Sequence, residues 1–186
     1  NRDQGVFWAG YVEALGNTKS ISINDTGAAY TEKTWNDTSP TSTVFSIGAQ
    51  SETSSGRFNV AGEDFIAYCF SSIEGYSKIG TYAGNNSTDG TFVYLGFTPA
   101  FILLKTYDNT DNWNIYDIKR NGYNGTGGTY QIRADTNQAG FSAAATMIDL
   151  VSNGVKMRTN DPGTNSARNY LYMAFAESPF KTSNAR

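Results

Sequence analysis

Short runs of β-branched and aromatic residues, each closed by Gly, Asn, Asp, Ser or Thr, fill most of this 186-residue chain. Such runs are typical of β-strands joined by tight turns, and no segment keeps the apolar period of an amphipathic helix beyond a turn or two. Only 17% of the residues are charged, so uncharged turn-forming residues, among them 19 Gly, must supply the polar surface. The sequence therefore predicts an all-β fold, either an antiparallel β-sandwich or a jelly-roll-like arrangement.

An internal repeat with an offset of 105 residues also limits the folds that the chain can adopt. Four aromatic or acidic residues recur as identical residues 105 positions further along the chain. Self-similarity at one fixed offset is the signature of a duplicated structural unit. The repeat anchors are Asp3, Trp8, Tyr11 and Phe70 in the first copy and Asp108, Trp113, Tyr116 and Phe175 in the second.

The offset sets the expected domain boundary. We predict a first β-sandwich repeat over residues 1–74 and a second, complete one over residues 75–186. Residues 75–106 open the second copy, and an offset of 105 places their counterparts before Asn1. We therefore expect the first copy to lack its opening strands here, and expect upstream sequence or another chain to supply them.

Strands are predicted where β-branched and aromatic residues gather between turn signals. The run Thr98–Lys105 is nearly continuously apolar, which predicts a strand buried on both faces. Asn153-Gly154 and the stretch Gly84–Gly90 are predicted turns, because Asn and Gly tolerate positive φ angles. The predicted strands are 6–12, 20–23, 43–47, 64–70, 77–82, 91–95, 101–106, 113–118, 130–133, 146–150, 155–158 and 170–176.

Residues that carry catalysis are scarce. The chain has no His, which removes the commonest general base and the commonest metal ligand. Cys69 is the only cysteine, and its place in an alternating run predicts a small core residue. Asp108–Asn112 offers oxygen ligands but lacks the glycine and distant glutamate of a calcium loop, so a solvated turn is the better interpretation. We predict no catalytic, cofactor-binding or metal-binding residues.

Charge and hydropathy limit the partners. The net charge is −3 and no cluster of Lys or Arg is present, so nucleic acid is not an expected ligand. No apolar run approaches the roughly 20 residues of a membrane-spanning helix. Trp8 and Trp113 could stack on sugars, but their recurrence in both copies favours a repeated core anchor.

Several motifs of the second copy resemble a repeat found in virion proteins of tailed, mainly marine, bacteriophages. The closing run Tyr172–Lys181 is the most specific of them, and Gly96–Phe101, Trp113 and Asn153-Gly154 also match. The resemblance covers residues 75–186, and more weakly residues 1–70. Such repeats occur in tail-fibre, adhesin-like and capsid-associated proteins, often in tandem.

The resemblance implies a non-enzymatic structural component of a virion: a tail fibre, an appendage or a capsid decoration. The expected partners are other virion proteins and further copies of the chain, with a trimer as the expected homo-oligomer. An adhesin module is the alternative, gripping host-surface glycans through loops such as Gly84–Gly90 and Asn121–Gly128. A glycan hydrolase with paired carboxylates is the second alternative.

Overall fold

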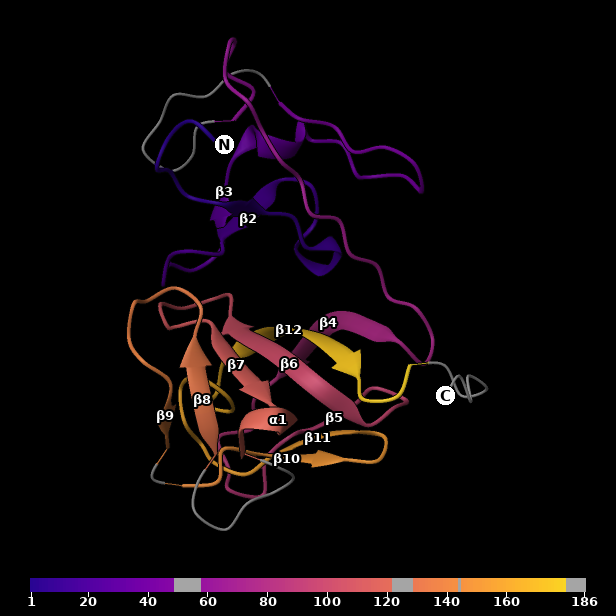
Figure 1. The fold of residues 1–186 in the computed structure, drawn as a ribbon, viewed down its shortest axis with the longest axis vertical. Coiled ribbons are helices and arrows are strands. Elements are labelled where there is room, and N and C mark those ends of the chain that lie inside the picture. Colours follow the sequence, from indigo (N-terminus) through magenta and orange to yellow (C-terminus); the bar gives the residue numbers. More distant parts are fainter. Residues whose placement is uncertain (49–57, 122–128, 144, 180–186) are drawn as a thin grey trace. The chain divides into compact units, whose positions relative to one another are not determined.

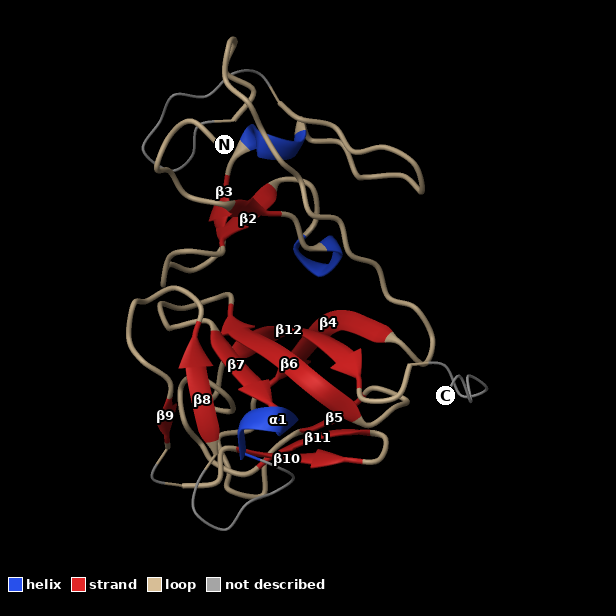
Figure 2. Ribbon diagram, viewed as in Figure 1, coloured by secondary structure: helices blue, strands red, loops and turns tan. Residues whose placement is uncertain are grey.

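The computed structural model describes residues 1–48, 58–121, 129–143 and 145–179. The chain divides into two compact units, Asn1–Cys69 and Phe70–Arg186. The dividing point lies five residues before the boundary expected from the repeat. Regular structure in the described residues is almost all antiparallel strand, with a few single helical turns (Figure 2), so the prediction of an all-β, antiparallel chain is confirmed.

The second unit contains two antiparallel sheets, labelled in Figure 1. The single helical turn α1 (Ile118–Asn121) follows β7 directly. The six-stranded sheet has the order β4 (Ser77–Ala83), β12 (Asn169–Ala176), β6 (Pro99–Thr106), β7 (Asn114–Asp117), β8 (Tyr130–Arg133) and β9 (Phe141–Ser142). The three-stranded sheet has the order β10 (Ile148–Val151), β11 (Gly154–Met157) and β5 (Phe92–Tyr94).

One hydrophobic core lies between these two sheets. Ile102 and Leu104 of β6 contribute to it from the larger sheet, and Val155 and Met157 of β11 from the smaller one. All four side chains are fully buried. Because both sheets send alternate residues into the same core, the unit is β-sandwich-like.

The run around β6 is a central strand, as its apolar sequence predicts. Its neighbours are β12 and β7. The prediction that both of its faces are buried holds only in part, since on the second face Lys105 is fully buried but Phe101 and Leu103 are half-buried. Alternation along a strand puts these residues on the face turned away from the core.

The hairpin between β10 and β11 turns through Ser152 and Asn153. The next residue, Gly154, pairs with Tyr94 of β5. A Cβ atom at Gly154 would lie 2.2 Å from the carbonyl oxygen of Val93. Glycine is required there because it lets the backbone of β5 approach this closely.

The first unit has little regular structure. A three-stranded sheet, in chain order, is formed by β1 (Ala9–Gly10), β2 (Lys19–Ser22) and β3 (Tyr30–Thr31). Two 3₁₀ turns, Glu13–Leu15 and Lys33–Trp35, follow β1 and β3. Ile21 is the only buried apolar side chain among the described residues of this unit.

Two strands predicted for the first unit are absent from the described residues. The runs Thr43–Ile47 and Asp64–Phe70 carry no strand pairing. Side-chain composition favours a strand locally, but a strand exists only where a partner supplies the ladder hydrogen bonds. No described helix in either unit is long and apolar enough to cross a membrane.

Candidate functional site

Asp108 ties the loop after β6 to the start of β12. Its carboxylate accepts hydrogen bonds from the backbone N–H and the side-chain Nδ2 of Asn169, both at 2.9 Å. It also accepts one from the Thr106 hydroxyl at 2.9 Å. Burial alone would raise the pKa of Asp108, but these hydrogen bonds outweigh it and lower the pKa below its ordinary value.

We expect Asp108→Asn to destabilise the second unit by on the order of 1 kcal/mol at pH 7, because the site is partly screened by solvent. The native pKa is lowered, so the carboxylate stabilises the fold above the ordinary aspartate pKa of about 3.9 and loses that effect as pH falls below it. Urea denaturation at several pH values measures the effect. A stability gap between wild type and variant that stays constant from pH 7 to pH 3 would contradict the prediction.

The aromatic anchors of the second unit lie in its interior. Trp113 is 3% exposed and Tyr116 is 1% exposed. The backbone N–H of Trp113 donates to the Asp135 carboxylate at 3.2 Å. Burial raises the pKa of Tyr116 far above its ordinary range. These side chains therefore stabilise the fold and offer no surface to a ligand.

The same aromatic anchors are less buried in the first unit, where Trp8 is exposed and Tyr11 is half-buried. Trp8 is 45% exposed, so the prediction of a buried core anchor is wrong at this position. Its indole stacks on Tyr68, with ring centroids 6.2 Å apart and planes 7° apart. Tyr11 packs edge-on against Trp35. The Asp3 carboxylate accepts a hydrogen bond from the backbone N–H of Asp64 at 2.6 Å.

Residues 65–69, here called the 65–69 run, form an exposed apolar segment. Phe65, Ile66 and Tyr68 are all large and exposed, Tyr68 to 64%. Cys69 is exposed as well, so the prediction of a core cysteine is wrong. The cause is the missing strand pairing. In a paired strand, alternate side chains of this run would lie on the face of a sheet that covers a core. Phe70 and Phe175, the closing anchors, meet edge-on in the second unit at 6.0 Å.

Asn165 organises the predicted turn Gly84–Gly90. Its side chain is fully buried, and its Nδ2 lies within hydrogen-bond distance of Asn85 Oδ1 and the Ser87 and Thr159 carbonyl oxygens. Its Oδ1 accepts from the backbone N–H groups of Asn85 and Thr91. Sequence reasoning missed this role, although Asn165 has a counterpart, Asn59, 106 positions earlier. The other loop expected to bind glycans, 121–128, lies outside the described residues beyond Asn121.

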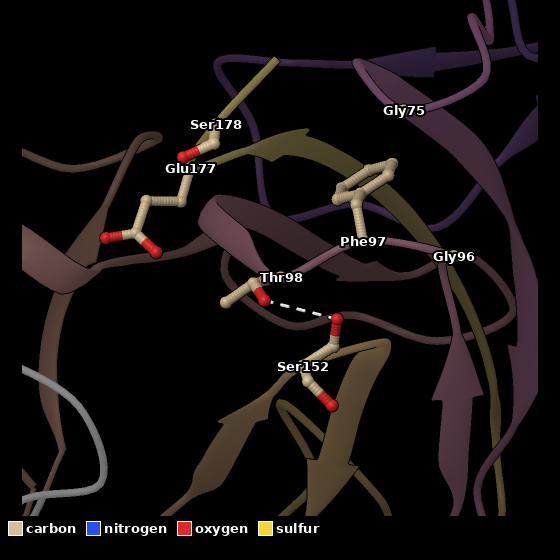
Figure 3. A pocket seen from close by; sticks show the side chains of 7 residues that line it. All are labelled: Gly75, Gly96, Phe97, Thr98, Ser152, Glu177 and Ser178. Carbon is tan, nitrogen blue, oxygen red and sulfur yellow. Dashed lines mark hydrogen bonds between the residues drawn. The ribbon is translucent and has the colours of Figure 1, made fainter. Parts of the chain in front are cut away.

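A small open pocket of about 260 Å³ lies beside the start of β6 (Figure 3). The Thr98 hydroxyl donates to the Ser152 carbonyl oxygen at 3.1 Å across it. Glu177 is the one carboxylate among the described lining residues, and its side chain extends away from the Phe97 ring. Paired-carboxylate hydrolysis needs a second acid facing the first, which the described lining does not provide.

The acidic turn after β6 is organised by protein groups. Asp111 forms an ion pair with Arg168 at 3.2 Å, and Asp108 is held as described above. No group of three or more potential metal-ligating acids or cysteines occurs in the described part of the chain. The solvated-turn interpretation of Asp108–Asn112 holds only in part: Asn109 and Asp111 accept hydrogen bonds from the next backbone N–H, whereas Asp108 and Asp111 also bind residues near the start of β12.

Comparison with known proteins gives a family and nothing more specific. Residues 1–179 match the model of a family described as a domain of unknown function, DUF7483. No curated protein and no solved structure matches the chain. Since the family model spans both units and nearly the full length, the chain belongs to the DUF7483 family.

Proposed function

We propose that the chain is a non-enzymatic structural module of a bacteriophage virion, which works by assembly and surface contact. The virion assignment is supported by the resemblance of the closing run Tyr172–Lys181, whose last two residues lie outside the described ranges, to repeats of tail-fibre and capsid-associated proteins. The assembly role is supported by the first unit, where one apolar side chain is buried among the described residues and the 65–69 run is exposed.

The imbalance between the two units carries the proposal. Ordering a chain costs roughly 1–2 kcal/mol per residue in backbone entropy, which burial of apolar surface must offset. The second unit buries a large apolar cluster, whereas Ile21 alone is buried among the described apolar residues of the first. Exposed contiguous apolar residues on a protein surface mark an interaction site. The first unit therefore acquires its stability from a partner that covers the 65–69 run.

The proposal is tested by cross-linking intact phage particles that carry the chain and identifying the linked peptides by mass spectrometry. We expect linked peptides that join Lys19 or Lys33 of the first unit to other particle proteins or to a second copy. Both lysines are exposed. If other particle proteins are cross-linked to one another but the chain forms no link to a neighbour, a structural role is contradicted.

The oligomeric part of the proposal has a separate test. We expect light scattering of the purified chain to give a mass of about three times 20.2 kDa. Introducing a charge with Tyr68→Asp should lower that mass, because a buried unpaired charge is costly at an interface. Tyr94→Asp is the matched control, since Tyr94 is similarly exposed but lies on β5 of the second unit. A wild-type mass of one chain would overturn the trimer.

Glycan binding is a second candidate function, favoured by the stacked pair Trp8 and Tyr68. An exposed flat aromatic surface can pack against the apolar face of a sugar ring. The test is a glycan array with wild type and Trp8→Ala. Reproducible binding that is lost in the variant would support an adhesin, and the absence of binding would leave assembly as the function.

A further inference from the structure

The two units share the register of a three-stranded sheet. β1, β2 and β3 pair in the same order and direction as β7, β8 and β9. A shift of 105 residues in β1, and of 111 residues in β2 and β3, carries every pair of the first sheet onto a pair of the second. Ala9↔Ser22, Gly10↔Ile21, Lys19↔Thr31 and Ser20↔Tyr30 become Asn114↔Arg133, Ile115↔Ile132, Tyr130↔Ser142 and Gln131↔Phe141.

Hydrogen bonds at the edge of each sheet follow the same shift of 105 residues. The backbone N–H of Arg2 donates to the Asp64 carbonyl oxygen at 2.8 Å, and that of Tyr107 donates to the Asn169 carbonyl oxygen at 3.1 Å. The Asp3 carboxylate receives the N–H of Asp64, just as the Asp108 carboxylate receives that of Asn169. Asp64 is therefore the counterpart of Asn169, the first residue of β12.

The 65–69 run consequently occupies the place of β12 without its neighbours. In the second unit β12 lies between β4 and β6, and Tyr170, Tyr172 and Ala174 are buried in the core. Their counterparts at a shift of 105 are Phe65, Ala67 and Cys69, which are all exposed. No strand in the described ranges pairs with this run.

We propose that residues 64–69 are a β-strand that accepts an antiparallel partner of the β6 type. The hydrogen bond from Arg2 to Asp64 is the last rung of that ladder. The register also fixes the edge of the run on which the partner lies. It is the edge next to Asn1, because Asn1 is the counterpart of Thr106, the last residue of β6. Asn1 therefore stands at the position of the last residue of the missing β6-type strand. The rest of that strand is joined directly to Asn1.

The chemistry of the partner follows from the two faces of the acceptor. Phe65 and Cys69 take inward positions, whereas Ile66 and Tyr68 take outward ones. A matching strand must be apolar on both faces, as β6 is with Ile102 and Leu103. This inference names the partner of the surface on which the proposed assembly role rests, namely the opening strand of a further copy of the unit.

The test extends the full chain with the sequence TPAFILLK, a copy of Thr98–Lys105, placed immediately before Asn1. We expect amide hydrogen exchange of Ile66 and Tyr68 to slow at least tenfold, because their N–H groups point to the same edge of the run as the carbonyl group of Asp64 and so face the added strand. The matched control carries one extra glycine between the extension and Asn1. A slip of one residue turns the side chains of the added strand to the wrong faces, so the control should give little protection.

Two further measurements make the result decisive. Ile66→Pro in the extended chain should abolish the protection, because proline removes a ladder donor. Exchange of β6 and β12 in the second unit reports whether the extended chain is still folded. Unchanged exchange at Ile66 and Tyr68, with the second unit protected, would overturn the inference. That outcome is independent of the particle cross-links, which test the assembly role itself.

Discussion

Replacing Leu104 by alanine is expected to lower the free energy of unfolding of the second unit by about 2–5 kcal/mol. Leu104 is fully buried in the core, near the end of the central strand β6. Its neighbours in the ladders are Tyr172 of β12 and Asn114 of β7, so the sheet cannot close around the lost volume without breaking its register. Urea denaturation followed by Trp113 fluorescence, in a background with Trp8→Phe and Trp35→Phe, measures this loss.

Leu103→Ala is the matched control for this prediction. Leu103 is adjacent, has the same side chain, and is half-buried on the opposite face of β6. We expect a loss of about 1 kcal/mol, in proportion to its smaller buried area. Equal losses at both positions would show that the second face of the sheet is packed as tightly as the core, and would contradict the single core described here.

Strands of the second unit are predictable from sequence because local and nonlocal signals agree there. The alternating run Ser77–Tyr82 and the apolar run after Pro99 become β4 and β6 within a residue or two. The Asn153-Gly154 signal marks the β10–β11 hairpin to within one residue, although the turn is Ser152-Asn153 and neither Asn153 nor Gly154 has the expected positive φ. Each of these runs finds a neighbouring strand within the same unit, so propensity and pairing lead to the same structure.

The run Asp64–Phe70 shows where sequence prediction of this kind stops. Its composition is as strand-like as that of β12, yet the structure leaves it unpaired and exposed. Propensity is a property of the residues themselves, whereas strand formation depends on a partner that lies elsewhere. The buried Trp113 and the exposed Trp8 differ for a related reason, because the first unit buries so little apolar surface.

The pattern of side-chain hydrogen bonds could be predicted only in part. The local bonds of the acidic turn, in which Asn109 and Asp111 accept from the next backbone N–H, follow from the preference of Asp and Asn for nearby backbone groups. The partners of Asn165 could not be anticipated, since Asn85, Ser87 and Thr91 lie more than 70 positions away in sequence. A single buried asparagine carries no periodic or local signal that would identify such a role.

Asn165→Ala is expected to lower the free energy of unfolding of the second unit by about 3 kcal/mol. Alanine removes every side-chain hydrogen bond to the turn Gly84–Gly90, and leaves the backbone N–H groups of Asn85 and Thr91 without that acceptor. Leaving several partly buried groups unsatisfied costs more than deleting one exposed hydrogen bond. Amide exchange within the turn should also quicken at least tenfold. Urea denaturation and hydrogen exchange measure the two effects.

Asn160→Ala is the matched control, because Asn160 is exposed and lies on the same connection between β11 and β12. It should change stability by less than about 0.5 kcal/mol. Asn165→Ala should leave the exchange of the 65–69 run unchanged, since that run belongs to the first unit. If stability and turn exchange both match wild type, Asn165 does not organise this turn.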